Sequence, residues 1–340
     1  MHSASRISRQ TWKFQRDIRL LGAGVATGPL EGQGPLAKEF DCVFDDAYAG
    51  EESWEKAERK LMEQAVQAAM KKSGVTAEQI DVMLAGDLLN QIITSNYTAR
   101  DHQFPLLGQF GACSTSMQGL AIASALVDGG FTQYALTGCS SHNSTAERQF
   151  RYPTEYGGQK PPYAQWTVTG AGASVVGIGQ NGPRVTHATI GKVTDMGIKD
   201  PFDMGSAMAP AAADTLVTHF EDLGRTPEDY DLIVTGDLGK VGSAILQDLM
   251  KETGYDLSSR YNDCGLMIFS SDQDVFSGGS GCASSAVVVY SHILNALNAG
   301  RYQRVFVVAT GALFSPVSFQ QGESIPCIAH GVVLERVNGI

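Results

Sequence analysis

The sequence predicts an α/β protein built from two similar halves, and three observations support this fold class. The chain has 340 residues, of which 43% are hydrophobic and 18% are charged, so it can bury one large core or two ordinary ones. Its 38 glycines stand singly or in pairs between apolar runs, as expected where many strands turn tightly into helices. A segment of the first half also recurs in the second.

The recurring segment is the strongest indication of a duplicated chain. Residues 74–87 are GVTAEQIDVMLAGD and residues 224–237 are GRTPEDYDLIVTGD, which match at Gly, Thr, Glu, Asp, Gly and Asp in the same relative places. Before each copy, apolar residues keep helical spacing up to a glycine, Gly74 or Gly224, that ends the helix. These residues are Trp54, Ala57, Leu61, Ala65 and Ala68 in the first copy and Ala212, Leu216, His219 and Phe220 in the second.

The order of the following elements is also shared. In each copy a threonine followed three residues later by Gln or Asp predicts a short helical turn. These pairs are Thr76 with Gln79 and Thr226 with Asp229. A buried strand, a glycine-flanked apolar helix, a second strand and a closing β-branched strand come next. They span residues 82–86, 111–130, 134–138 and 167–179 in the first half and 232–236, 278–300, 304–311 and 327–337 in the second.

The two halves meet at a turn-forming tripeptide, residues 181–183 (NGP). We therefore expect an N-terminal half of residues 1–181 and a C-terminal half of residues 182–340, joined without a flexible linker. Residues 142–166 are polar, aromatic and rich in turn formers, which indicates a functional loop or a partner surface.

Composition excludes several classes of protein. The 25 basic and 36 acidic residues give a net charge of −11 without a basic stripe, so nucleic acid is not an expected partner. No apolar run approaches the roughly 18 residues of a membrane span, and the N-terminal residues lack the apolar centre of a signal peptide. We expect a soluble or at most peripheral protein. Six scattered cysteines without a C-x-x-C pair favour a reducing compartment and no structural metal.

Cys113 is the first candidate for a functional residue. It lies between a short apolar strand at 105–110 and a helix that begins at Ser114, Thr115 or Ser116. The unpaired N–H groups at such a helix start lower a thiol pKa and bind anions. The alternative is a small cysteine that is simply buried beneath a helix.

The segment GACSTS, the apolar helix after it, the strand ending in TG and the duplication together resemble the thiolase superfamily over nearly the whole chain. This resemblance implies a five-layer αβαβα fold and a homodimer. It also implies that Cys113 stands where the condensing enzymes carry their nucleophile.

Two bases that the superfamily pattern calls for are missing. A His is expected at the end of the first core strand of the second half, where this chain has Gly236 or Asp237. A His or Asn is expected in the following glycine-rich turn, where this chain has Gly279. Because an activated thiolate needs a neighbouring base, we do not expect an efficient condensing enzyme. An acyltransferase that uses Cys113 as nucleophile and His142 as base stays the alternative, although His142 is equally a loop residue.

A narrower resemblance rests on FGACSTS, SSHN, AERQFRYPTEYGGQKPP, GSAMAPAAADT and GGSGCASSA. These segments resemble a family of thiolase-like stage V sporulation proteins of spore-forming bacteria. The resemblance implies binding of dipicolinic acid (pyridine-2,6-dicarboxylic acid), with a part in its uptake into the developing spore and its release in germination. It also implies membrane proteins of the stage V A group as partners, and a peripheral position on the cytoplasmic face of the spore inner membrane.

The expected ligand site is the cleft at Cys113, without cofactor or metal. One carboxylate would face the N–H groups of Ser114, Thr115 and Ser116, because a helix start attracts anions. The ring would lie against the glycine-rich turn from Gly278 to Gly281, which includes the site residues Gly279 and Ser280 and where missing side chains leave room. His142, Arg148 and Arg151 could lean over the opening, whereas Asp237 would repel the ligand unless it accepts a hydrogen bond. A pure scaffold for membrane partners, without any small ligand, stays a further alternative.

Overall fold

The computed structural model describes residues 5–151 and 159–337, and its strands repeat one arrangement twice. The first set has the order β5-β4-β6-β8-β2 and the second has the order β11-β10-β13-β14-β9. In both sets the first three strands run parallel and the last two pair antiparallel. The predicted duplication is therefore confirmed, whereas its boundary at residues 181 and 182 stays a prediction. The two sets of strands meet where Arg19 of β2 pairs with Arg184 of β9.

The strands of the first set are β2 (Ile18–Thr27), β4 (Val82–Asp87), β5 (Leu106–Gly108), β6 (Tyr134–Ser141) and β8 (Gly170–Ile178). Those of the second set are β9 (Arg184–Thr189), β10 (Leu232–Thr235), β11 (Tyr261–Asp263), β13 (Arg304–Ala312) and β14 (Cys327–Glu335). Short strands complete the sheets: β1 (Thr11–Lys13), β3 (Cys42–Val43), β7 (Trp166–Thr167) and β12 (Gly279–Ser280).

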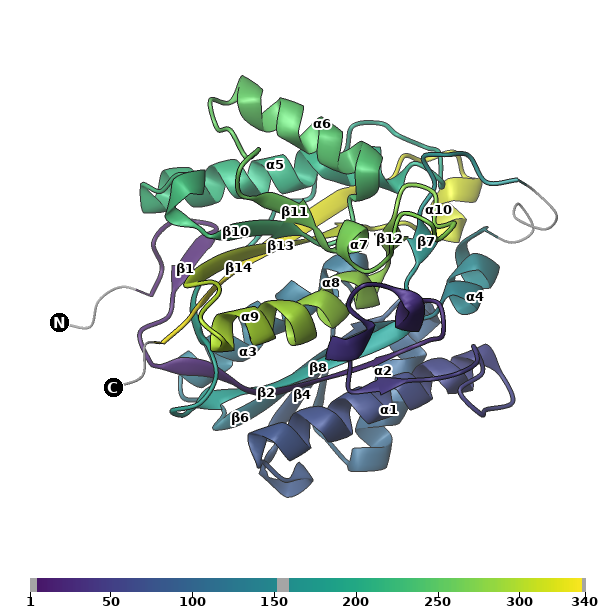
Figure 1. Cartoon of the computed structure of the whole chain (residues 1–340). Coiled ribbons are helices and arrows are strands. Elements are labelled where there is room, and N and C mark those ends of the chain that lie inside the picture. The colour runs from purple at the N-terminus through teal and green to yellow at the C-terminus, as the bar shows by residue number, and fades with distance from the viewer. Residues whose placement is uncertain (1–4, 152–158, 338–340) are drawn as a thin grey trace.

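Helices and sheets form five layers, as Figure 1 shows. One outer layer holds α1 (Trp54–Ser73) and α2 (Ile93–His102), and the other holds α5 (Met204–Leu223) and α6 (Gly239–Glu252). Between the sheets lie α3 (Thr115–Asp128), α8 (Cys282–Val288) and α9 (Leu294–Asn298), the last two joined by the π-helical turn η8 (Val289–Ile293). The short helices are α4 (Asn143–Ala146), α7 (Cys264–Met267) and α10 (Pro316–Gln320). The αβαβα arrangement is therefore confirmed.

The first outer helix shows why these residues form these layers. The Ser53 hydroxyl accepts a hydrogen bond from the Lys56 N–H at the start of α1, and Gly74, with φ of 71°, ends the helix. Gly24 lets α1 approach β2, because a Cβ at position 24 would lie 2.2 Å from the Ala65 carbonyl oxygen. The predicted turns after α1 and α5 are confirmed as capping boxes.

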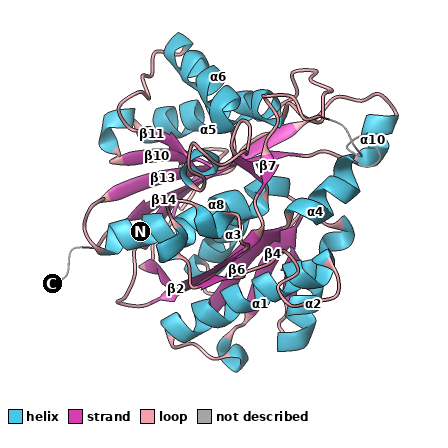
Figure 2. Cartoon of the chain, turned by 45° about the vertical axis from the view of Figure 1, so that its right-hand side comes forward, coloured by secondary structure: helices cyan, strands magenta, loops and turns pink. Residues whose placement is uncertain are grey.

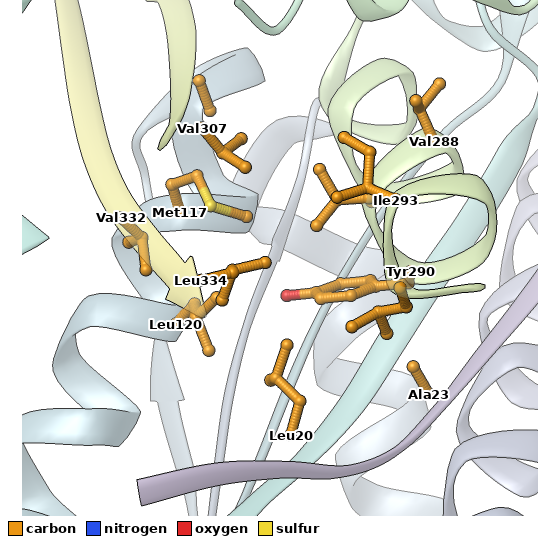
Figure 3. Packing of buried hydrophobic residues seen from close by; sticks show 14 of the residues in the cluster. Leu20, Ala23, Met117, Leu120, Val288, Tyr290, Ile293, Val307, Val332 and Leu334 are labelled. Atoms are coloured by element: carbon orange, nitrogen blue, oxygen red, sulfur yellow. The ribbon is translucent and has the colours of Figure 1, made fainter. Parts of the chain in front are cut away.

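One apolar core fills the space around the middle layer. Figure 3 shows side chains from β2, α3, η8, β13 and β14 packed together there. They include Leu20, Ala23, Met117, Leu120, Tyr290, Ile293, Val307, Val332 and Leu334. Each large apolar side chain contributes about 1.5–3 kcal/mol on full burial. Because both sheets supply these residues, the two halves share one core.

Candidate functional site

The site lies where equivalent strands of the two halves end and two helices of the middle layer begin. Thr235 ends β10 and is followed by Gly236 and Asp237, while the short helix η5 (Ala112–Ser114) leads into α3. The strand β12 pairs in parallel with β7, which brings Ser280 beside Thr167. Figure 2 shows β7, α4 and α10 on this same side of the molecule.

Cys113 and Asp237 face each other at the centre of the site. The Cys113 thiol and the Asp237 carboxylate interact electrostatically. Burial and the neighbouring Asp237 carboxylate raise the pKa of the Cys113 thiol well above its ordinary value. The thiol is therefore held protonated, which is the opposite of what a nucleophilic cysteine requires.

Asp237 is fully buried and is surrounded by donors. Its Oδ1 accepts a hydrogen bond from Thr310 Oγ1 at 2.7 Å, and its Oδ2 accepts from the Gly281 N–H at 3.0 Å and from Ser280 Oγ at 3.1 Å. Burial raises the pKa of Asp237, and these hydrogen bonds oppose that rise. The carboxylate is thus satisfied by the protein itself.

A second buried carboxylate lies behind the first. Asp263, at the end of β11, accepts hydrogen bonds from Thr235 Oγ1 at 2.6 Å and from the N–H groups of Leu238 and Gly239 at 2.9 and 3.1 Å. Burial raises the pKa of Asp263 to about 7. Both carboxylates therefore hold the turn that leads from β10 into α6.

A small cavity with an interior of about 70 Å³ lies beside Cys113 and is lined from both halves. Its polar side chains are Cys113, Thr167 and Ser280, and its other side chains are Leu88, Ala112, Ala146, Phe150, Met204, Met208, Ala312 and Phe314. Of the described residues that line the cavity, none is Lys, Arg or His.

An outer groove adjoins the cavity. Phe150 and Phe314 line both spaces, and their rings meet edge to face with centroids 5.8 Å apart. Gln149 fixes one side of the groove, because its Nε2 donates to the Leu88 carbonyl at 2.7 Å and its Oε1 accepts from the Asn90 N–H at 2.9 Å. The two phenylalanines therefore separate the cavity from the groove.

The structure brings Cys113, Asp237 and Ser280 together. At the helix start that follows Cys113, however, the side chains of Ser114 and Ser116 form hydrogen bonds within the protein. Ser114 Oγ donates to the Gly111 carbonyl at 2.6 Å, and Ser116 Oγ shares a 2.6 Å hydrogen bond with Ser285 Oγ of α8. The Thr115 hydroxyl is buried without a hydrogen-bond partner. None of Ser114, Thr115 and Ser116 is among the described residues that line the cavity.

His142 lies outside the cavity lining and makes contacts elsewhere. Its Nε2 lies 2.7 Å from the Ala47 carbonyl, and its Nδ1 accepts from the Ser144 N–H at 3.2 Å at the start of α4. Burial lowers the pKa of His142, so the ring is neutral at pH 7. With both ring nitrogens engaged in this way, His142 acts as a helix cap in this structure.

Of the predicted basic residues near the opening, Arg148 is engaged elsewhere. Arg148 forms an ion pair with Glu55 and lies over the Trp54 ring at 5.7 Å. The side chain of Arg151 lies outside the described part of the structure.

The absent side chain at position 279 does not leave the room that we expected. A Cβ on Gly279 would lie 3.1–3.2 Å from Val168, Gly265 and Phe269, so the protein already fills this space. Gly281 is required for another reason, since its φ of 97° and ψ of 168° suit glycine alone. Glycine is therefore needed at position 281 for its backbone conformation, and the turn does not create space for the ligand.

Four cavity residues had no signal in the sequence. Met204 and Met208 lie one turn apart at the start of α5, Phe314 follows β13, and Phe150 lies in the π-helical turn η6 (Glu147–Arg151). The spacing of Met204 and Met208 on one helix face could have indicated a shared apolar surface, but not which surface.

The duplicated five-layer fold and a cysteine at the start of a middle-layer helix define a thiolase-like protein, and solved structures agree. Over 94% of this chain and 99% of its own, 3-oxoacyl-[acyl-carrier-protein] synthase III from Aquifex aeolicus matches with a TM-score of 0.58 and 14% identity. Cerulenin-bound OleA from Xanthomonas campestris matches over 94% of this chain and 99% of its own, with a TM-score of 0.62 and 14% identity. At this identity the likeness establishes the fold alone.

The sequence identifies the family. The model of stage V sporulation protein AD matches residues 8–335. Stage V sporulation protein AD of Bacillus subtilis (strain 168) is 60% identical over 331 residues, which are 97% of this chain and 98% of that protein. The chain belongs to the stage V sporulation protein AD family and is a sporulation protein with a thiolase-like fold. Within the described residues, we find no helix with the length and apolar character of a membrane span.

Proposed function

We propose that this protein binds dipicolinic acid in the cavity beside Cys113, and that it takes part in uptake of this acid into the developing spore and its release in germination. Membership of a sporulation protein family supports a part in spore development. The site supports binding over condensation, and the observation that carries this proposal is the fully buried Asp237 carboxylate beside the Cys113 thiol.

The buried carboxylate beside the thiol argues against acyl condensation for a chemical reason. An efficient condensing site needs a thiolate and a base that accepts the thiol proton, and general-base help is typically worth about 10²- to 10⁴-fold. Here the group that faces the thiol is a buried carboxylate, and carboxylates close to a thiol favour its protonated form. His142, the candidate base, contacts Ala47 and Ser144 instead.

The cavity suits a flat aromatic acid. Phe150, Phe314, Met204 and Met208 give apolar contact surface for a ring, with aromatic edges and thioethers that pack well against π systems. The Ser280 and Thr167 hydroxyls and the Cys113 thiol supply donors at the inner end. An apolar cavity with a few convergent polar groups is the usual form of a small-molecule site.

The partners belong to the same proposal. The protein assembles at the cytoplasmic face of the spore inner membrane with membrane proteins of the stage V A group, and it forms a homodimer. The edge strand β5 supports the homodimer, because it pairs with β4 on one side only and carries Leu107, which is 48% exposed. Phe110, which is 64% exposed, extends this apolar surface beside the outer groove.

Calorimetric titration with dipicolinate, with pyridine-2-carboxylate and pyridine-3,5-dicarboxylate as analogues, tests the proposal. We expect saturable one-site binding of dipicolinate and weaker binding of both analogues. Cys113→Phe fills the cavity and should abolish binding while the melting temperature stays near that of the parent. The control is Ile178→Phe, which introduces the same side chain at the far, 41% exposed end of β8 and should bind as the parent does.

Three results would overturn the proposal. Undiminished dipicolinate binding by Cys113→Phe would place the ligand elsewhere. Rapid turnover of a radiolabelled acyl-CoA that is lost in His142→Ala would establish an acyltransferase. A complete lack of small-molecule binding by the folded parent would favour a scaffold for the membrane proteins.

A further inference from the structure

A dianionic ligand in the proposed cavity would lie close to a buried carboxylate. Asp237 is fully buried directly behind two residues that line the cavity, the Cys113 thiol and the Ser280 hydroxyl. The Ser280 hydroxyl donates its hydrogen bond to Asp237 at 3.1 Å, and the Cys113 thiol interacts with the same carboxylate, so Asp237 engages both groups while it is ionised. An aromatic dicarboxylate with ordinary carboxyl pKa values carries two negative charges at pH 7. The ligand therefore meets a like charge and occupied donors.

Within the described residues, the titratable groups that face Asp237 are acidic or neutral. The group from η5 is Cys113, those from β11 and α7 are Asp263 and Cys264, and the one from β14 is Cys327. The contacts from β13 and from the turn before α8 are the Thr310 and Ser280 hydroxyls and the Gly281 N–H. None of these groups is positively charged, so none offsets the charge of a ligand carboxylate placed beside Asp237 and Asp263.

Protonation of Asp237 removes both obstacles at once. A neutral carboxyl group no longer repels the ligand and no longer needs all of its donors. Ser280 Oγ–H and Cys113 S–H can then turn toward the ligand, because both belong to the cavity lining as well as to the Asp237 network. Burial already favours the protonated form by raising the pKa of Asp237.

Resting on the proposed function, we infer that Asp237 takes up one proton when the dicarboxylate binds, so that the site accepts its ligand as a dianion plus a proton. In the balanced step the ionised Asp237, the dianion and one proton from water give the neutral Asp237 carboxyl group with the dianion bound. Asp237 thereby sets the pH dependence and the charge specificity of the site.

The sign of the pH dependence follows from this balance. Binding that takes up a proton strengthens as the pH falls, by up to tenfold in Kd for each pH unit. The slope applies between the pKa of Asp237 in the free protein and its higher pKa in the complex. Below that window Asp237 is already protonated, and the slope disappears.

Calorimetry on the full chain tests the inference. Dipicolinate is titrated at pH 7 in buffers that differ in their heat of ionisation, which gives the number of protons taken up. We expect close to one proton for the parent, and a Kd that falls toward lower pH. The uncharged analogue pyridine-2,6-dicarboxamide should bind without this proton.

Asp237→Asn is the decisive variant, because it keeps the shape of the side chain and one acceptor oxygen. We expect it to lose the proton uptake, to bind with a Kd that changes little with pH, and to bind more tightly than the parent at pH 8. Glu31→Gln is the matched control. Glu31 is another buried carboxyl, its pKa is raised to about 7 by burial, and it accepts from the Thr169 N–H outside the cavity lining. This control should keep the proton uptake of the parent.

The outcomes separate this inference from the proposed function. Dipicolinate binding by the parent without proton uptake and with a flat pH profile would overturn the inference and leave the proposed function standing. The same result follows if Asp237→Asn keeps the full proton uptake. Absence of binding at every pH by a folded parent would overturn the proposed function itself. If Asp237→Asn does not fold, the proton count of the parent decides alone.

Discussion

Thr310→Val removes the hydrogen bond that stabilises the ionised Asp237, together with the 3.3 Å hydrogen bond that Thr310 Oγ1 accepts from the Asp237 N–H. Thr310 is fully buried on β13, and its Oγ1 donates to Asp237 Oδ1 at 2.7 Å. Valine has nearly the same shape but no hydroxyl. A hydrogen bond to a charged group is worth about 1.5–3 kcal/mol, so the variant should lose about that much unfolding free energy while Asp237 is ionised. The same loss should raise the pKa of Asp237 by about one to two pH units.

The effect must depend on pH, and its sign is fixed. The lost hydrogen bond stabilises the carboxylate, so its contribution is present above the pKa of Asp237 and disappears as falling pH protonates the group. Thr310→Ser is the control, because it keeps the hydroxyl and loses only a methyl group, at a cost of about 1 kcal/mol at any pH.

Urea unfolding followed by circular dichroism at pH 5 and pH 8 measures this difference. We expect the valine variant to fall further below the serine variant at pH 8 than at pH 5. An equal difference between the two variants at both pH values would refute the reasoning, because the Thr310 hydroxyl would then not act on a titrating Asp237.

Three further predictions concern other features of the structure. Gly281→Ala should lower the unfolding free energy by about 1–3 kcal/mol, because its backbone conformation suits glycine and a Cβ would lie 2.7 Å from Ser141 Oγ; an unchanged melting temperature would contradict this. Iodoacetamide at pH 8 should modify the half-buried Cys42 before Cys113, as followed by mass spectrometry, since burial and Asp237 suppress the Cys113 thiolate; modification of Cys113 first would count against its protonated state. Leu107→Lys should turn a dimer into a monomer in sedimentation velocity, and a monomeric parent at micromolar concentration would exclude the dimer.

Local patterns in the sequence predict the elements whose signals lie close together in the chain. Helical spacing up to Gly74 gives α1, and a threonine with Gln79 gives the capping box that follows. The sequence does not predict α6, because Gly239 and Gly242 lower its helix propensity. In the structure Gly242 serves packing against α5, since a Cβ there would lie 2.5 Å from the Gly205 carbonyl oxygen. Close contact between two helices therefore outweighs local propensity.

The candidate site likewise combines features that the sequence predicts with features that arise only from the fold. The resemblance to thiolases brings Cys113 and the strand end at Asp237 to one place, and in the structure the Asp237 carboxylate acts on the Cys113 thiol. Met208, Phe150 and Phe314 reach the cavity from three separate elements, so no sequence window contains their shared position. His142 follows a strand end as a ligand-binding residue would, yet local bonds to Ala47 and Ser144 occupy its ring. Such competition for a side chain is visible only in three dimensions.

On the proposed function, the carboxylate at the end of β10 accounts for a thiolase-like arrangement that binds a ligand without condensation chemistry. At this position a base would withdraw the Cys113 proton, whereas the Asp237 carboxylate raises the pKa of the thiol and keeps the proton on sulfur. Thr310, Ser280 and the Gly281 N–H support the carboxylate within the same cleft. The site thereby combines a protonated thiol with a carboxyl group whose charge responds to pH. On this reasoning the proton taken up at Asp237 takes the place of the cation that the described cavity lining lacks.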